Sequence, residues 1–383
     1  MPLAAPDISE GDRERVWAAL EDPRIAGGPS VVAFEQAVSS QLEAGQGVAV
    51  TSGTAALHLA LIAVGVEPGD LVLMPTQTFV APAHAASYVG AELLLFDSEA
   101  RYRQLDVERM VAWLREHCDS DGEKTIHVES GKRIGAIVPV DLLGHLCDVE
   151  ALAAAVRDMG IPLVEDAAQG LGATLRGRPA GAHADVTCLS FNANKLVTSG
   201  GGGMLLCRNE KLIRYVRDLA NQAKIDGPYY VHKSIGFNYR LPSAQAALGL
   251  AQFERIDEFL ERKARVARFY ERELSSVAGL SLPQRAPEAT VTNWLFTVHV
   301  DPSVCGCTAD ELMKRLEKGH RIESRPIFTP LHSCGVYAGR QAHDCPVAER
   351  LAASGLSIPS SVSASDDELA RVCEAIRIEL GSS

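Results

Sequence analysis

DVTCLSFNANKLVTSGGGGM, residues 185–204, is the stretch around which the rest of the chain is organised. Residues 186–191 form a short apolar run, which predicts a buried strand. In the polar patch that follows, Lys195 is the only cationic side chain between Arg178 and Arg208. A lone lysine just beyond a buried strand is well placed to act as a nucleophilic amine in a pocket. Taken by itself, however, this stretch is more simply explained as structure without catalysis.

Short apolar runs alternate with helical patterns through most of the chain upstream of this lysine. Because a helix separates most neighbouring runs, the pattern predicts a largely parallel sheet that is covered on both faces. Ligands of such sheets gather at the carboxyl ends of the strands. The strands expected are 47–53, 71–76, 92–97, 135–142, 162–167, 185–191 and 202–207.

The pattern changes after residue 241. Residues 242–275 predict one long amphipathic helix, whose apolar positions recur every three or four residues and which we expect to cross between two domains. The elements expected beyond it are a strand at 294–300, a capped helix at 308–319 and a closing helix at 366–380. The sequence therefore predicts a large domain at 1–250 and a small α+β domain at 251–383.

The composition restricts the class of protein and its partners. The 383 residues are 46% hydrophobic and 22% charged, which is typical of a globular protein, and the net charge of −12 argues against nucleic acid or an anionic membrane as the main partner. The start of the chain has no secretory signal and no apolar run is long enough to span a membrane, so we expect a cytoplasmic protein. The nine cysteines include no CxxC motif, which favours free thiols in a reducing compartment. Cys305 and Cys307 lack a second pair at zinc spacing, so no metal site is predicted.

Two further features lie at predicted strand ends. Residues 52–55, Ser-Gly-Thr-Ala, join a strand to a helix, where free N–H groups and hydroxyls can hold a phosphate. An ordinary turn with Thr54 as the helix N-cap explains the same residues. Glu165 and Asp166 end a buried strand and point to opposite faces, so one of them can enter a site. A buried carboxylate needs a cationic partner, and either an arginine or a protonated pyridine nitrogen would supply it.

In combination these parts are those that a pyridoxal phosphate site requires. Lys195 would bond the cofactor, Asp166 would keep its ring nitrogen protonated, the turn and Ser190 would hold the phosphate, and Phe79 would cover the ring. The four consecutive glycines 200–203 do not indicate a dinucleotide site, because they precede a strand and the GxGxxG pattern is missing.

Five ordered segments resemble the successive signatures of the DegT/DnrJ/EryC1/StrS family of pyridoxal 5′-phosphate (PLP)-dependent nucleotide-sugar aminotransferases. The resemblance covers nearly the whole chain. It implies an α/β protein of the aspartate aminotransferase type (PLP fold type I), with a mostly parallel seven-stranded sheet in the large domain and a smaller α+β C-terminal domain. The segments are 51–61 (TSGTAALHLAL), 75–81 (PTQTFVA), 164–172 (VEDAAQGLG), 190–204 (SFNANKLVTSGGGGM) and 236–249 (GFNYRLPSAQAALG).

The resemblance also implies a role for individual residues. Lys195 matches the lysine that bonds the cofactor and moves protons, and Asp166 matches the partner of the pyridine nitrogen. Asn238 matches an asparagine that reaches the cofactor phosphate of the neighbouring subunit, which implies an obligate homodimer with two shared sites. The other implied cofactor contacts are Gln169 beside the ring, Phe79 stacked on it, and Gly53, Thr54, Ala55 and Ser190 at the phosphate.

The presence of Lys195 separates this chain from a second branch of the family, sugar 3-dehydratases, in which histidine replaces the lysine. A transaminase is therefore expected, and a regulator without turnover is a weaker alternative. The reaction implied is transfer of the amino group of L-glutamate to the cofactor, giving pyridoxamine 5′-phosphate and 2-oxoglutarate, and then to a keto sugar.

Two segments, 222–249 and 322–332, resemble enzymes that aminate C4 of 4-keto-6-deoxy hexoses for surface glycans. The substrate implied first is UDP-2-acetamido-2,6-dideoxy-4-keto-hexose, and GDP-4-keto-6-deoxymannose, used by enzymes of the perosamine synthase type, is the alternative. Arg325 and His332 are expected to contact the sugar nucleotide, although domain-interface structure explains them equally well. Phe328 stands where this subgroup often has tryptophan.

Overall fold

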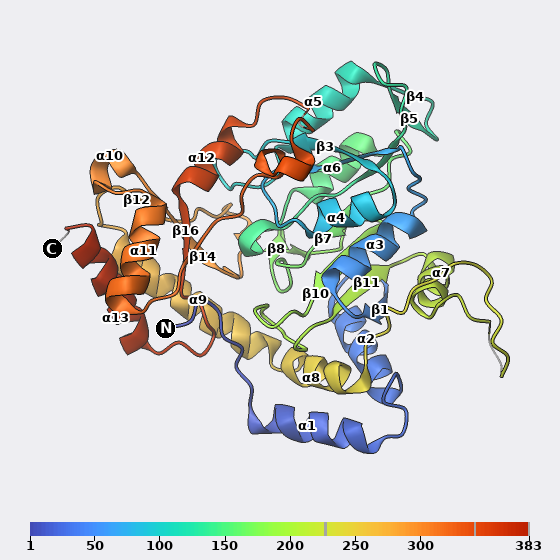
Figure 1. Ribbon diagram of the computed structural model, residues 1–383, viewed down its shortest axis with the longest axis horizontal. Helices are drawn as coiled ribbons and strands as arrows, with labels where there is room; N and C mark the ends of the chain where they lie inside the picture. Colours follow the sequence, from blue (N-terminus) through green and yellow to red (C-terminus); the bar gives the residue numbers. More distant parts are fainter. Residues whose placement is uncertain (226–227, 341, 382–383) are drawn as a thin grey trace.

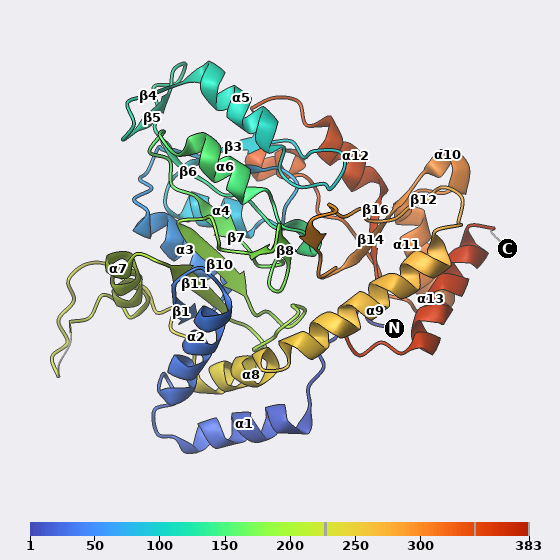
Figure 2. The same ribbon diagram turned by 180° about the vertical axis from the view of Figure 1, so that it is seen from behind.

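The computed structural model describes residues 1–225, 228–340 and 342–381. The long helix α9 (Ile256–Leu274) runs from the large domain, with its central sheet, into a smaller α+β unit that contains the C-terminus (Figure 1, Figure 2). Asp226 and Gly227, which belong to the segment 222–249 used for the substrate prediction, lie outside the described residues, as do Gln341, Ser382 and Ser383.

The central sheet consists of a group of four strands, in the order β1-β11-β10-β7, and a group of three, in the order β3-β2-β6. Neighbouring strands are parallel except at β11, which is antiparallel to β1 and to β10. Isolated parallel bridges between residues 137 and 163 and between 140 and 166 bring β6 beside β7. The prediction of a mostly parallel sheet is thus confirmed. The strands are β1 (Gln46–Val50), β2 (Leu71–Pro75), β3 (Glu92–Phe96), β6 (Ile134–Ile137), β7 (Val164–Asp166), β10 (Val186–Ser190) and β11 (Gly203–Cys207).

Helices cover both faces of this sheet, which is why β2 and β11 are buried along their whole length. Met74 and Leu205 pack on the face covered by α3, α4 and α7, whereas Leu73 and Leu206 pack on the opposite face, against α5 and α6 or against α2 and α8. Full burial of each such side chain contributes about 1.5–3 kcal/mol. The helices are α2 (Pro29–Gln41), α3 (Gly53–Ala63), α4 (Ala81–Tyr88), α5 (Val107–His117), α6 (Val149–Val156), α7 (Glu210–Ala220) and α8 (Ser243–Phe253).

The long helix expected at 242–275 is interrupted, and α8 ends at Phe253 before α9 begins at Ile256. Arg255, at the break, pairs with Asp7 and with Asp12, which is buried in α1 (Glu10–Glu21). Periodicity could not show this break, because it depends on charged residues from the start of the chain. The polar stretch 118–133 contains a short hairpin of β4 (Cys118–Ser120) and β5 (Thr125–His127).

The smaller unit is built on an antiparallel sheet in the order β12-β14-β16-β15, packed on α9, α11 and α13. The first residues of the chain join it, since Ser360 N donates to Leu3 O. Residues 328–340 and 342–348 return to the large domain, where Leu331 N donates to Thr76 O. Because the chain passes between the two units in both directions, the domain boundary expected at residue 250 stays a prediction. The elements are β12 (Leu280–Ser281), β14 (Phe296–Val300), α10 (Pro302–Cys305), α11 (Ala309–His320), β15 (Arg325–Pro326), α12 (Pro346–Ser354), β16 (Gly355–Ile358) and α13 (Asp366–Glu379).

A small three-stranded sheet connects the two units, with β13 (Ala289–Thr290) paired to β8 (Thr174–Leu175) and β8 to β9 (Arg178–Pro179). Across the ranges that the structure describes, no helix combines the length and the apolar character needed to cross a membrane.

Candidate active site

A cavity of about 320 Å³ opens at the carboxyl ends of β1, β7 and β10, where the strand pattern predicted a ligand site. Asp166 is the last residue of β7, Lys195 lies in the turn after β10, and Phe328 comes from the segment that returns from the smaller unit. The cavity brings together most of the predicted cofactor contacts. These are Gly53, Thr54, Phe79, Asp166, Gln169, Ser190 and Lys195.

The start of α3 forms one end of the cavity. Ser52, and not Thr54, is its N-cap, because the Ser52 Oγ accepts the N–H of Ala55 at 3.0 Å. Gly53 and Thr54 line the cavity with the first N–H groups of the helix, which are the ones that an anion can use. Ala55 is not among the lining residues and its N–H is already bonded, so the structure does not place this predicted phosphate contact at the cavity.

Glycines let three backbone segments meet at this end. A Cβ on Gly53 would lie 2.9 Å from the Cβ of Ser190, and a Cβ on Gly203 would lie 2.5 Å from the backbone of Ser52. Gly202, with φ +126°, lines the cavity and bridges to Ser52. The glycine run after the lysine is therefore a close backbone approach that brings β11 against the start of α3.

Asp166 and Lys195 are the ionisable groups that line the cavity in the described part of the chain. Burial raises the pKa of the Asp166 carboxyl, and the N–H of Ala168 and the charge of Lys195 oppose that effect. Burial lowers the pKa of Lys195 to about 8, with the Asp166 charge acting in the opposite direction. A lysine in this range is a competent nucleophile and base near neutral pH.

Gln169 is oriented by the loop after β6. The Leu143 N–H donates to Gln169 Oε1 at 2.8 Å, which leaves the amide NH₂ group of Gln169 to donate into the cavity. Asp141 anchors this loop, because its Oδ1 accepts the N–H of Cys147 at 2.9 Å. Leu143 has φ +59° and Gly144 has φ +89°, so the loop turns tightly at the cavity wall.

Asp141 and Glu165 form a buried carboxyl pair that the sequence analysis did not identify. Asp141 is fully buried, and among the described residues its Oδ2 has no hydrogen-bond donor. Burial raises the pKa of both groups, that of Glu165 to about 7 and that of Asp141 well above its ordinary value, where the charge of Glu165 adds to the effect. A proton on Asp141, donated to Glu165, satisfies both side chains. The sequence carried a signal for Asp141, since it ends an apolar run as Asp166 does.

Asp141→Asn should weaken the pH dependence of stability. Burial raises the pKa of Asp141 well above its ordinary value of 3.8, so in the pH range between the unfolded and the folded pKa folding takes up a proton on this group. The contribution of this group is therefore fully present below its ordinary pKa and is lost as the pH rises, by about 1.4 kcal/mol per pH unit. An amide does not titrate and still donates to Glu165. Between about pH 5 and 7 the free energy of unfolding, measured with urea, should thus fall less steeply with pH in the variant than in the wild type. The difference between the two slopes should be about 1.4 kcal/mol per pH unit. Parallel curves would show that Asp141 is ionised in the folded protein.

Two aromatic residues that were not predicted as site residues also line the cavity. Trp294 was expected to begin a strand, but β14 begins at Phe296 and the indole of Trp294 lies in the cavity. Its Nε1–H donates to the carbonyl of Asn194 at 2.7 Å. The Phe328 ring lies 5.8 Å from the ring of Phe79, which is 55% exposed. These two phenyl rings lie side by side at the cavity, and nothing in their local sequence signalled the pairing.

Besides Ala55, three further predicted residues are not brought to the cavity of their own chain. Asn238 is exposed in the loop after α7. Arg325 is exposed and pairs with Glu323 at 2.7 Å. His332 is buried, and its Nδ1 lies 2.7 Å from the hydroxyl oxygen of Thr76. The contacts of His332 are those of domain-interface structure, so the structure places neither Arg325 nor His332 where a contact to substrate in this cavity was expected.

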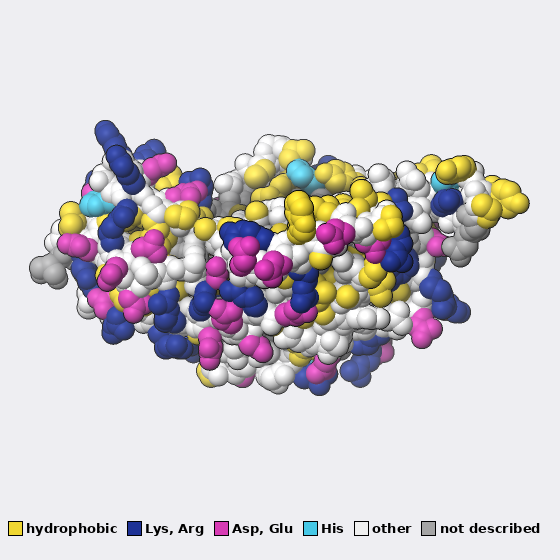
Figure 3. Space-filling model, turned by 90° about the horizontal axis from the view of Figure 1, so that it is seen from below, with side chains coloured by type: hydrophobic (Ala, Val, Ile, Leu, Met, Phe, Trp, Pro, Cys, Tyr) yellow, Lys and Arg dark blue, Asp and Glu magenta, His cyan; other side chains and the backbone are white. Residues whose placement is uncertain are grey.

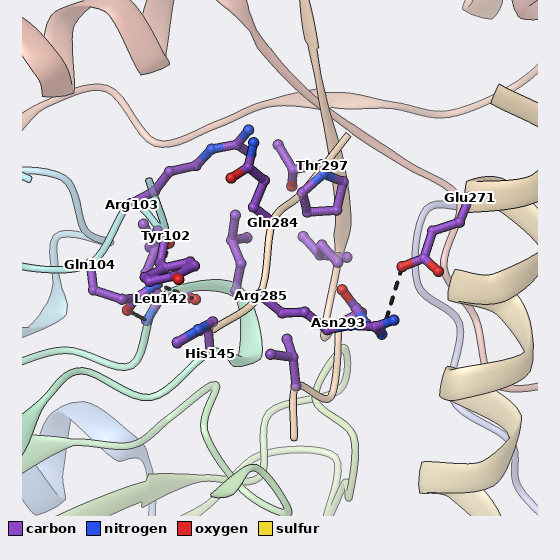
Figure 4. A pocket seen from close by; sticks show the side chains of 14 residues that line it. Tyr102, Arg103, Gln104, Leu142, His145, Glu271, Gln284, Arg285, Asn293 and Thr297 are labelled. Atoms are coloured by element: carbon purple, nitrogen blue, oxygen red, sulfur yellow. Dashed lines mark hydrogen bonds and ion pairs between the residues drawn. The ribbon is translucent and has the colours of Figure 1, made fainter. Parts of the chain in front are cut away.

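Another cavity, of about 40 Å³, is lined by residues of the large domain and of the smaller unit (Figure 4). Leu143, which bonds Gln169, and Asn293, which precedes Trp294, line it. The Arg103 side chain extends toward Gln284, whereas Arg285 turns toward Glu271 at 3.8 Å. No lysine lines this cavity within the described ranges, so it lacks the nucleophile of the first. The same ranges contain no group of three or more His, Cys, Asp or Glu side chains that could hold a metal ion.

The chain is similar to known proteins over nearly its whole length. GDP-perosamine synthases of Caulobacter vibrioides and of Escherichia coli O157:H7 are 33% and 30% identical to the chain, over 98% of it and over 96% and 97% of their own lengths. The crystal structure of the aminotransferase TlmJ from Streptoalloteichus hindustanus superposes with a TM-score of 0.87 at 27% identity, covering 100% of this chain and 99% of that one.

The prediction of an α/β protein of PLP fold type I is confirmed by these comparisons, since the structural neighbours are sugar aminotransferases of that fold. The model of the DegT/DnrJ/EryC1/StrS aminotransferase family matches residues 6–377, which is nearly the whole chain. Enzymes of this family use PLP as their cofactor. The chain therefore belongs to the DegT/DnrJ/EryC1/StrS aminotransferase family and is a PLP-dependent aminotransferase of nucleotide-sugar metabolism.

Proposed function

We propose that the chain transfers the amino group of L-glutamate to C4 of GDP-4-keto-6-deoxymannose, within the cytoplasm. The observation that carries this choice is the 33% identity, over 98% of the chain, to a GDP-perosamine synthase. The UDP-linked acetamido sugar that the sequence favoured is less well supported. That expectation depended on segments 222–249 and 322–332, and Phe328 in the second segment departs from the pattern on which it was based.

The residues of the cavity fit PLP. Bound PLP withdraws electrons from the carbon atom that carries the amino group, so that its proton can be removed. In the proposed site Asp166, buried at the end of β7, holds the protonated ring nitrogen, since it is the carboxylate that lines the described cavity. The N–H groups of Gly53 and Thr54 and the hydroxyl of Ser190 hold the phosphate. Phe79 covers the ring and Gln169 donates beside it.

Lys195 has two tasks in this proposal. It bonds the cofactor, and while it is free it removes and returns the proton at the reacting carbon. With a pKa of about 8, a useful fraction of its amine is neutral at physiological pH, and the protonated form is acidic enough to give the proton back.

We further propose a homodimer in which Asn238 of each chain completes the site of its partner. Asn238 is exposed and lies outside the lining of the cavity in its own chain. Hydrophobic side chains gather on the side of the molecule where α1 lies (Figure 3). The exposed large apolar residues of α1, of α2 and of the turn between them are Trp17, Leu20, Ile25 and Val32.

Mixing two inactive variants tests this arrangement. If the sites are shared, dimers formed from Lys195→Ala and Asn238→Ala chains have one site with both substitutions and one native site. Random reassociation of equal amounts should then give about a quarter of the wild-type activity, because half of the dimers are mixed. Activity no higher than that of the two variants measured separately would contradict shared sites.

The substrate is tested by comparing kcat/KM for GDP- and UDP-linked 4-keto-6-deoxy sugars, with glutamate as donor and mass detection of the amino sugar. We expect the GDP sugar to be preferred by at least about a hundredfold, because a site built to bond one nucleobase leaves polar groups unpaired with another. A preference for the UDP-linked acetamido sugar would reverse the proposal. Failure to release 2-oxoglutarate from glutamate would instead favour a regulator without turnover.

A further inference from the structure

The amino group of Lys195 lies over the face of the Trp294 indole. Its Nζ is 3.9 Å from the centre of the ring, and Trp294 is 5% exposed. An ammonium group at this distance is attracted by the negative potential of the ring face, and more strongly where water is excluded. Lys195 thus has two attractive neighbours in the cavity, the Trp294 ring and the Asp166 carboxylate.

Contacts from three other segments fix the position of Trp294. Its Nε1–H donates to the carbonyl of Asn194, the residue that precedes the lysine. Its own carbonyl accepts from Lys263 Nζ in α9 at 2.7 Å, and Lys263 also donates to the carbonyl of Ser360. A Cβ on Gly144 would lie 2.9 Å from the Trp294 backbone nitrogen, so the loop after β6 packs directly against it. The ring is therefore a rigid surface, shared between the large domain and the smaller unit.

We propose that Trp294 is a positioning residue for Lys195, whose indole face holds the amino group of the lysine at the cavity whenever that group is free. This inference rests on the proposed function, in which Lys195 is bonded to the cofactor at one stage and free at the next. A free lysine side chain has many rotamers. A surface that attracts its amino group keeps it within reach of the reacting carbon, and it favours the ammonium form that exists after the lysine has taken up a proton.

The charged groups around Lys195 and Trp294 determine in which direction the pKa of Lys195 should change when the ring is removed. Asp166 is the carboxylate lining the described cavity, and it favours the ammonium form as the ring does. Asp7 and Lys263 line a small neighbouring cavity together with Lys195 and Trp294. Burial lowers the pKa of Lys263 to about 7, so this second lysine is mostly neutral at the pH at which Lys195 titrates. Loss of the ring face alone should therefore make Lys195 lose its proton at lower pH.

Acetylation measures directly the pH at which Lys195 loses its proton, because acetic anhydride reacts with the neutral amine only. The cofactor-free full-length chain is labelled between about pH 6 and 10, and the Lys195 peptide is quantified by mass spectrometry. The midpoint for the wild type is expected near 8. Trp294→Leu should lower it by about one pH unit. Trp294→Phe keeps a ring face without the Nε1–H donor and should lower it by less. Trp113→Leu, in α5, is the matched control and should leave it unchanged.

Three results would overturn the role of Trp294: a midpoint in Trp294→Leu that is unchanged, one that is raised, or an effect in Trp294→Phe as large as in the leucine variant. If circular dichroism shows that Trp294→Leu does not fold, Trp294→Phe is used as the test variant and Trp113→Phe as its control. A labelling midpoint of Lys195 that is not lowered in Trp294→Phe then contradicts the proposal. Incubation of the wild type with PLP before labelling should protect Lys195. Lack of protection would contradict the proposed function itself, whereas protection without a shift contradicts only the role of Trp294.

Discussion

Replacement of Lys195 by alanine is expected to lower turnover at least roughly 10⁴-fold and to abolish the visible absorbance that PLP acquires when it is bonded to the protein. The size of the effect follows from the two tasks proposed for one amine. The substitution removes the nucleophile that bonds the cofactor and the base that moves the proton, and Lys195 is the one lysine that lines the described cavity. Absorbance spectra of the purified protein and release of 2-oxoglutarate from glutamate measure the two losses separately.

Lys211→Ala is the matched control for this experiment, because Lys211 is exposed on α7 and is not among the residues that line the cavity. It should retain both the colour and the turnover of the wild type. Survival of colour and turnover in Lys195→Ala would refute the assignment of Lys195. Survival of colour alone would show that another lysine bonds the cofactor.

Asp166→Asn is expected to slow the reaction with glutamate by about 10²–10⁴-fold while the protein stays folded. A neutral amide keeps the shape of the side chain and can still accept the N–H of Ala168, but it leaves a protonated ring nitrogen without its charge partner. Breaking a buried pair of charges in this way costs about 3–5 kcal/mol. Single-turnover release of 2-oxoglutarate from the PLP-loaded protein measures the loss.

Glu165→Gln gives the comparison that isolates this effect, since Glu165 is the neighbour of Asp166 on β7 and its carboxylate faces Gly181 and Thr187. It should alter stability and leave the rate of the glutamate reaction within about tenfold of the wild type. If Asp166→Asn reacted as fast as Glu165→Gln, the charge of Asp166 would have no part in the chemistry.

The central part of the fold and of the site could be predicted because the signals were local. The buried strand before Lys195, the acidic end of β7 and the glycine-containing turn before α3 each lie within a few residues of sequence. A parallel sheet brings such strand ends to one edge. That single physical rule was sufficient to place Asp166, Ser190 and Gly53 around one cavity.

What the sequence did not reveal depends on contacts between distant segments. Trp294 enters the cavity because Lys263 and Asn194 hold it there, 31 and 100 residues away. The buried position of His332 is fixed by Thr76, 256 residues away. At the break between α8 and α9, Arg255 likewise pairs with Asp7 and Asp12 at the start of the chain. No periodicity or motif within a window of sequence carries such information.

The N-terminus of α3 shows a second limit of what could be predicted from the sequence. Ser52 and Thr54 are both good N-cap residues, and composition does not choose between them. In the structure Ser52 is the N-cap, and it is the residue whose backbone Gly203 approaches closely, one residue before the helix begins. As a result Thr54 faces the cavity, and Ala55 donates to Ser52 instead.

The most direct test of the central claim is to identify the lysine that bonds the cofactor. The PLP-loaded protein is reduced with borohydride, which makes a lysine–cofactor bond permanent, and is then digested and analysed by mass spectrometry. The account predicts one cofactor adduct per chain, on the peptide that contains Lys195. An adduct on another lysine, such as the buried Lys263, or no adduct in a protein that retains turnover, would contradict it.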